Sequence, residues 1–376
     1  MKQTFLLYLT VLLVMTGCHH QSSNNGISVI TPAQRLEQRL DTMRRHGYMF
    51  GHQDDPFYGT TWEWETGKSD TRLVTGDWPA VMGFDLGGIE MGDDKNLDSV
   101  PFSRIREEAI AHYCRGGIIT FSWHPRNPLT GGTAWDVSDT ATVSSILPGG
   151  AEAGKFEVWT KRVIDFLETL QTREGRRIPI MLRPWHECNG SWFWWGKKCC
   201  TDEQYHALWC LFQDRVGKAL PKSIVWCYSP NLQGNWTEDR FMERYPGDDR
   251  VWMIGCDAYQ WGTEKDFVRD LTADLTFLDS LATQHHKVIA LTECGYKNSP
   301  DSTWWTRVLK PVIDAFPLSY ILPWRNAKHE HFGPAPDLPT REDFIRFYEA
   351  PNTLFLEDIN PSKMRVGRDS SELLWL

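Results

Sequence analysis

The sequence predicts a single α/β domain with the (β/α)8, or TIM-barrel, fold. Eight short apolar runs of β-strand character recur along the 376 residues, and amphipathic helical segments separate them. No G-x-G-x-x-G or Walker motif follows any of these runs, so a nucleotide-binding sheet would have no segment to hold phosphates. Eight alternations of strand and helix in about 300 residues therefore favour a closed parallel barrel over a doubly wound sheet.

The predicted strands share continuous apolar stretches, as expected for strands that a parallel sheet buries on both faces. They are residues 48–53, 80–85, 117–123, 178–184, 224–228, 251–257, 288–293 and 320–324.

The segments between these strands carry helical patterns. In residues 156–170 the apolar side chains recur at three- and four-residue spacing, which places them on one helix face. Thr201 and Gln204 form a capping box that begins a helix over 202–220. The other predicted helices are residues 104–114, 267–282, 303–315 and 341–348.

Two long connections, residues 54–78 and 124–155, follow the carboxyl ends of predicted strands. Both are rich in Gly, Pro, Asp and Trp. Loops at these ends form the cleft of a barrel enzyme, so we expect both segments to line a cleft.

The N-terminal segment has the pattern of an export signal. Lys2 precedes an apolar stretch over residues 5–15, and the segment 15–18, MTGC, resembles a bacterial lipoprotein box. We therefore expect residues 1–17 to be a lipoprotein signal peptide and Cys18 to be lipidated. A simple secretory peptide is the competing interpretation.

The remaining chain divides into a lipidated tether, residues 18–30, and the barrel domain, residues 31–376. The expected location is that of an exported bacterial lipoprotein whose only membrane contact is its lipid. No acidic cluster follows Cys18, which favours a periplasm-facing anchor over display at the cell surface.

The composition narrows the class of partner. Acidic residues outnumber basic ones by 49 to 40, a net charge of −9 that argues against nucleic acid as a ligand and favours a neutral partner. The 19 tryptophans exceed what core packing needs, and a tryptophan face is suited to stack on a pyranose ring. We expect a monomer that binds a neutral carbohydrate.

The cysteines and histidines do not form a metal motif. The sequence has no pair of CxxC units and no H-E-x-x-H segment, so no metal and no other cofactor is predicted. Free thiols are expected at most cysteines. Cys199 and Cys200 are the expected exception, because one of them could pair with a distant cysteine.

Two glutamates at strand ends are the main candidates for chemistry. Glu187 follows the fourth predicted strand amid several tryptophans, and Glu293 ends the seventh. These strands face one another across the barrel, so the two carboxyl groups can meet at its mouth. Retaining cleavage of a glycosidic bond needs two carboxyl groups about 5–5.5 Å apart. The alternative is that both are ordinary solvated or ion-paired carboxylates.

Several segments together resemble glycoside hydrolase family 26, whose best-known members are β-mannanases. They occur in the family's order along nearly all of the barrel domain. The segments are 183–190, RPWHECNG; 192–196, WFWWG; 50–53, FGHQ; 122–125, SWHP; 257–261, DAYQW; 292–295, TECG; and 323–326, PWRN.

The resemblance implies a role for each matching residue. Glu187 would be the general acid/base, with a raised pKa, and Glu293 the nucleophile of a double displacement. Tyr259 would hydrogen-bond Glu293, and Arg183 would be a counter-charge that keeps a carboxylate ionised. The alternative for Arg183 is that it only links strands at the barrel rim.

The resemblance also implies the residues that bind the sugar. His124 would recognise the axial 2-hydroxyl that distinguishes mannose from glucose, and Trp324 would form the floor of the same subsite. A buried histidine satisfied by backbone is the alternative for His124. The full expected set is Trp123, His124, Arg183, His186, Trp192, Trp195, Tyr259, Trp324 and Asn326.

The function implied by this resemblance is cofactor-free, retaining hydrolysis of β-1,4-mannosidic bonds in mannan, galactomannan or manno-oligosaccharides. Endo attack is favoured, and release of mannobiose from a chain end is the open alternative. A β-glucanase or xylanase of the same family is one rival. A glycan-binding lipoprotein without activity is another, which the presence of both Glu187 and Glu293 disfavours.

Overall fold

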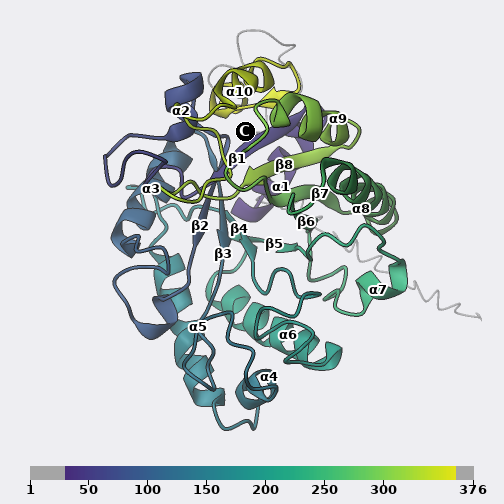
Figure 1. Ribbon diagram of the computed structural model, residues 1–376. Helices are drawn as coiled ribbons and strands as arrows, with labels where there is room; N and C mark the ends of the chain where they lie inside the picture. Colours follow the sequence, from purple (N-terminus) through teal and green to yellow (C-terminus); the bar gives the residue numbers. More distant parts are fainter. Residues whose placement is uncertain (1–29, 361–376) are drawn as a thin grey trace, which may run out of the picture. The chain divides into compact units, whose positions relative to one another are not determined.

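The computed structural model describes residues 30–360, and they form a closed barrel of eight parallel strands surrounded by helices (Figure 1). The strands are β1 (Tyr48–Gln53), β2 (Val81–Asp85), β3 (Ile118–Ser122), β4 (Ile180–Arg183), β5 (Ile224–Tyr228), β6 (Met253–Tyr259), β7 (Val288–Gly295) and β8 (Leu318–Pro323). Each strand pairs with its neighbours in sequence, and β1 pairs with both β2 and β8, which closes the ring. The predicted TIM-barrel fold is confirmed, with every predicted strand in place.

Helices connect successive strands around the outside of this ring (Figure 1). They are α2 (Asp70–Thr75), η1 (Ile89–Met91), α3 (Phe102–Cys114), α4 (Thr142–Ile146), α5 (Ala153–Glu168), α6 (Asp202–Ala219), α7 (Glu238–Met242), α8 (Glu264–His285), η2 (Trp304–Leu309), α9 (Lys310–Ile313) and α10 (Arg341–Tyr348). A short strand, β9 (Thr353–Leu354), pairs with β1, and α11 (Leu356–Ile359) follows it.

The helix predicted over residues 303–315 is instead two elements, the π-helical η2 and the short α9. Pro311 lies in the first turn of α9 and has no backbone N–H to continue the hydrogen-bond pattern of a single α-helix. The segment changes its helix type where proline enters it.

Helix α1 (Pro32–Met43), which is not among the predicted helices, closes the N-terminal end of the barrel. Its buried residues Leu36, Leu40 and Met43 pack in one cluster with residues from all eight barrel strands, including Met181 and Tyr320. Such a cluster can form only in the barrel interior, because neighbouring strand residues point to opposite faces. The N-terminal end is therefore packed shut, and the opposite end is left for a cleft.

The cysteines of the described residues are all free thiols. Cys199 and Cys200 are buried and unpaired, so the expected exception does not form. Among residues 30–360, no helix combines the length and apolarity needed to cross a bilayer. The predicted signal peptide and the lipidation site Cys18 lie outside the described residues.

Candidate active site

Glu187 and Glu293 lie together at the C-terminal end of the barrel. Glu293 belongs to β7, which extends two residues beyond its predicted end, and Glu187 follows β4 in a loop. Trp185 and Glu187 adopt left-handed backbone conformations with φ of 56° and 51°. Such strain costs about 1–3 kcal/mol per residue and persists only where surrounding contacts hold it. One of these contacts is the Glu187 N–H, which donates to the Ser229 carbonyl at 2.8 Å.

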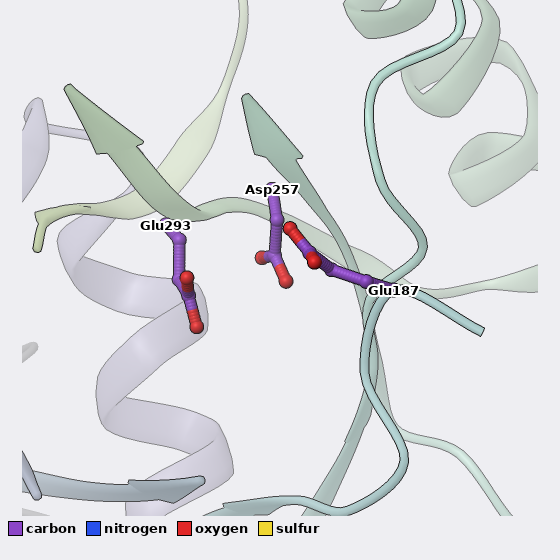
Figure 2. A group of neighbouring side chains, drawn as sticks. All are labelled: Glu187, Asp257 and Glu293. Atoms are coloured by element: carbon purple, nitrogen blue, oxygen red, sulfur yellow. The ribbon is translucent and has the colours of Figure 1, made fainter. Parts of the chain in front are cut away.

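A third carboxylate, Asp257 of β6, lies beside the two glutamates, and Figure 2 shows the three side chains together. One carboxylate oxygen of each residue lies within 4.8 Å of those of the other two, and all three residues are buried. Arg183 donates to Glu293 and, at 3.0 Å, to Asp257 Oδ2. The Arg183 guanidinium supplies positive charge at two of the three carboxylates, as a bound cation would otherwise do.

The carboxylate of Glu187 accepts one hydrogen bond at each oxygen. Asn231 Nδ2 donates to Oε1 at 2.8 Å, and Trp192 Nε1 donates to Oε2 at 2.6 Å. Burial and, secondly, the nearby charge of Glu293 raise the pKa of Glu187 to about 7, although the bonds from Asn231 and Trp192 partly oppose this rise. Glu187 can therefore carry a proton near neutral pH.

The carboxylate of Glu293 accepts a hydrogen bond at each oxygen. Tyr259 donates its hydroxyl hydrogen to Oε2 at 2.7 Å, and Arg183 donates to Oε1. A guanidinium on one oxygen and a hydroxyl on the other hold this carboxylate in a fixed orientation. The two glutamates thus lie in different environments, since two neutral donors bind Glu187 whereas a guanidinium and a hydroxyl bind Glu293. Such a difference is what an acid and a nucleophile side by side require.

Two histidines line the cleft beside the glutamates. His124 Nδ1 lies 2.6 Å from the buried Asp85, and His124 Nε2 lies 3.0 Å from Nε2 of His186. Burial opposes a charge on His124, but the charge and hydrogen bond of Asp85, together with the charges of Glu293 and Glu187, raise the pKa of His124. Burial and the nearby charge of His124 lower the pKa of His186 well below its usual value. A charged His124 can therefore donate a hydrogen bond from Nε2 to a neutral His186. A sugar hydroxyl could take the place of His186 as the acceptor.

The cleft above these groups has a volume of about 570 Å³. Its aromatic walls include Trp135, Trp192 and Trp261, whose exposed fractions are 49%, 37% and 69%. Its lining residues are Leu97, Asp98, His124, Trp135, His186, Glu187, Trp192, Phe193, Asn231, Tyr259, Trp261, Glu293, Trp324, Arg325, Glu330 and Phe332. Exposed aromatic faces around buried carboxylates are suited to bind and cleave a sugar chain.

Trp192 reaches Glu187 because the chain leaves room for its ring. A Cβ atom added at Gly190 would lie 2.4 Å from the ring of Trp192. Only glycine allows the indole to lie this close to the backbone, so Gly190 permits the hydrogen bond from Trp192 to Glu187.

Four residues expected to bind the sugar lie behind the cleft lining. Trp123 and Trp195 are fully buried, and their indole N–H groups donate to Glu90 and to the His186 carbonyl. Asn326 donates to Asp70 and to the Pro334 carbonyl, so it anchors the segment after β8 rather than a ligand. Arg183 binds Asp257 and Glu293, with its side chain 2% exposed. The expected residues that do line the cleft are His124, His186, Trp192, Tyr259 and Trp324.

The expectation for the connection 54–78 is wrong, because none of the cleft residues comes from it. This connection is instead packed behind the segment after β8, where Asp70 accepts a hydrogen bond from Asn326. The connection 124–155 does line the cleft, through His124 and Trp135.

Several lining residues are not among those predicted from the sequence. Asn231 follows β5, so the rule that strand ends carry chemistry could have found it. Trp261 and Arg325 lie within the segments 257–261 and 323–326 but were not selected. Trp135 lies in a long loop without periodicity, and no sequence signal distinguishes it.

Comparisons with known proteins agree on one family. A family model described as glycosyl hydrolase family 26 matches residues 29–300. A mannan endo-1,4-β-mannosidase of Bifidobacterium adolescentis is 30% identical over 283 residues, which are 69% of this chain and 28% of that protein. One of Bacillus subtilis is 25% identical over 275 residues, 68% of either chain. This chain therefore spans less than a third of the Bifidobacterium protein.

Solved structures give the same result. A β-mannanase of this family from Bacteroides ovatus is 44% identical, with a TM-score of 0.85 over 88% of this chain and 97% of its own. An endo-β-1,4-mannanase from Cellulomonas fimi is 30% identical, with a TM-score of 0.78 over 87% of this chain and 76% of its own.

Proposed function

Because the chain belongs to glycosyl hydrolase family 26, we propose that it is a retaining mannan endo-1,4-β-mannosidase that needs no cofactor. The observation that carries this proposal is the approach of Glu187 and Glu293 to within 4.8 Å, where Glu187 can carry a proton near neutral pH and Glu293 is bound by Arg183 and Tyr259. The names of relatives from Bifidobacterium adolescentis and Bacillus subtilis support the substrate.

The distance between the carboxylates supports retention of configuration. Inverting glycosidases separate the two carboxyl groups by about 6.5–9.5 Å to admit a water, whereas retaining enzymes bring them to about 5–5.5 Å. Glu187 would donate its proton to the glycosidic oxygen while Glu293 forms a bond to the anomeric carbon. A water would then attack that carbon, give its proton to Glu187 and release Glu293, so both residues return to their starting states.

Recognition of mannose would fall to groups beside the two glutamates. A charged His124, held by Asp85, offers an Nε2–H to the axial 2-hydroxyl of the sugar. Trp324 lies with its ring centroid 5.9 Å from that of His124 and would stack beneath the same sugar. Tyr259 would keep Glu293 aimed at the anomeric carbon.

A β-glucanase is the second candidate, because one relative favours it. Endoglucanase H of Acetivibrio thermocellus is 26% identical over 169 residues, 44% of this chain and 16% of that protein. The match is shorter than those to the mannosidases, and a change of sugar would leave both glutamates in place.

One assay separates these candidates. Reducing-sugar release and product profiles should be followed over time on mannan, galactomannan, xylan and mixed-linkage glucan. Early release of mixed manno-oligosaccharides supports endo attack on mannan. Mannobiose as the sole early product would show instead that the protein acts from a chain end. Release from glucan or xylan alone would overturn the mannosidase proposal. Binding without release would make the protein a glycan-binding lipoprotein.

We also propose that the enzyme is an exported lipoprotein, anchored through Cys18 and facing the periplasm, and that it is a monomer. The support for the anchor is the segment 15–18, MTGC. Cys18→Ala should move the protein from the membrane fraction to the soluble fraction. Protease added to intact cells should leave a periplasm-facing protein uncut, and light scattering would measure the oligomeric state.

A further inference from the structure

We propose that Arg244 is a positioning residue for Glu187, a role that rests on the proposed function. Arg244 follows α7 and is 2% exposed. It lies outside the cleft lining, behind the loop between β4 and α6 that carries the acid/base. It would act on the reaction only through the shape of that loop.

The loop is folded around the Arg244 guanidinium. Nη1 donates to the Cys188 carbonyl at 3.0 Å and to the Trp195 carbonyl at 3.1 Å. Nη2 donates to the Cys200 carbonyl at 2.6 Å, and Nε donates to Asp202 at 2.6 Å. Three backbone carbonyls spread over thirteen residues therefore converge on one side chain. The planar guanidinium offers five N–H groups in a fixed fork, which a lysine ammonium cannot match.

These contacts surround the groups that set the geometry of Glu187. Cys188 is its chain neighbour, and Trp192, which donates to its carboxylate, lies between the two carbonyls that Nη1 binds. The guanidinium also lies over the ring of Tyr205, at 5.2 Å from the centroid. The hydroxyl of Tyr205 donates to the Trp185 carbonyl at 3.0 Å.

The backbone strain at Trp185 and Glu187 makes this support necessary. Both residues have positive φ, and unsupported backbone would relax out of that region. Arg244 donates to the carbonyl of Cys188, the residue after Glu187. Tyr205, whose ring lies under the guanidinium, donates to the carbonyl of Trp185. Loss of the guanidinium hydrogen bonds should therefore move the Glu187 carboxylate away from the departing oxygen, while β7 and Glu293 stay in place.

The test compares two substrates that differ in their need for an acid. A manno-oligosaccharide needs protonation of its leaving oxygen, whereas a dinitrophenyl β-mannobioside does not. For Arg244→Lys we expect kcat/KM on mannotetraose to fall by about 10- to 100-fold, and kcat/KM on the aryl substrate to change by less than about 3-fold. Thermal unfolding of each variant would confirm that it is folded at the assay temperature.

Lys197→Ala is the matched control. Lys197 pairs with Glu243, so this exposed ion pair joins the same two segments as Arg244 without binding a carbonyl of the loop. The control should match wild type on both substrates. If Arg244→Lys does not fold, Asp202→Asn removes the carboxylate partner of the guanidinium and should give the same selective loss to a smaller extent.

The outcomes separate this inference from the function on which it rests. Equal losses on both substrates would show a purely structural role, and no loss on either would show that the loop holds its shape alone; each would overturn the inference. Wild-type protein inactive on both substrates would overturn the proposed function as well.

Discussion

Trp192 donates its indole N–H to Oε2 of Glu187 at 2.6 Å. This bond favours the charged form of a carboxylate that burial and the charge of Glu293 otherwise disfavour. The pKa of Glu187 is therefore set by opposing effects, and its value of about 7 is where they balance. That balance can be measured in the pH dependence of the reaction.

The wild-type enzyme should lose activity on unactivated substrate as the pH rises through about 7. Above that pH Glu187 has released the proton that the leaving oxygen needs, so kcat/KM on manno-oligosaccharides should fall about tenfold per pH unit. A dinitrophenyl mannobioside needs no acid and should show no such fall. The same alkaline limb for both substrates would point to a group other than Glu187.

Trp192→Phe should shift this alkaline limb to higher pH. Phenylalanine keeps a ring in the cleft but removes the N–H, so the charged form of Glu187 loses a donor and its pKa rises further. A lost hydrogen bond to a charged group should move the limb by about one pH unit. Full pH profiles of kcat/KM would measure it, and a shift to lower pH would contradict the assigned balance.

Trp324→Ala should weaken catalysis through the lost sugar platform. Trp324 lines the cleft at the end of β8, and stacking of an aromatic ring is worth about 1 kcal/mol or more, a fall in kcat/KM of about fivefold or greater. Trp64→Ala is the control, because Trp64 is a tryptophan that lies outside the cleft lining, with 39% of its surface exposed. Equal rates for both variants would place Trp324 outside the subsite.

The barrel was predictable because each strand is a continuous apolar run with a clear end. Both glutamates could be selected because they lie near strand ends: Glu293 belongs to β7, and Glu187 lies four residues after β4. The missed helix α1 had a signal as well, the capping box of Thr31 and Gln34 before an amphipathic segment.

The cleft surface was less predictable, because it depends on which way each side chain points. Neighbouring residues at a strand end point to opposite sides, so Trp123 and His124 could not both face the sugar. His124 faces the cleft and Trp123 the core. Residues such as Trp135 and Arg244 are placed by loop conformations that have no period in the sequence, so no pattern could select them.

Glu187→Gln should change how stability depends on pH. In wild type the folded protein keeps the Glu187 proton up to about pH 7, whereas the unfolded chain releases it near 4.5. Protonation therefore stabilises the fold at low pH, and this contribution, about 3 kcal/mol, is lost as the pH rises from 4.5 to 7. Glutamine has no proton to lose.

The free energy of unfolding of Glu187→Gln, taken relative to that of wild type, should thus increase from pH 5 to pH 8. Urea unfolding at several pH values would measure this difference. Glu107→Gln, on the exposed side of α3, controls for the removal of a surface carboxylate. A difference that does not vary with pH would contradict the raised pKa of Glu187.

Replacement of each glutamate by alanine, with azide as a substitute anion, should identify the two roles by the product. In Glu293→Ala, Arg183 remains bound to Asp257 and can attract azide into the space that the Glu293 carboxylate leaves. Azide would then attack the anomeric carbon of an activated β-mannoside in one displacement and give the α-mannosyl azide. In Glu187→Ala, Glu293 first forms its covalent intermediate, and azide in place of water would give the β-anomer by two displacements. Proton NMR of the products distinguishes the anomers, and the opposite assignment would exchange the acid/base and the nucleophile.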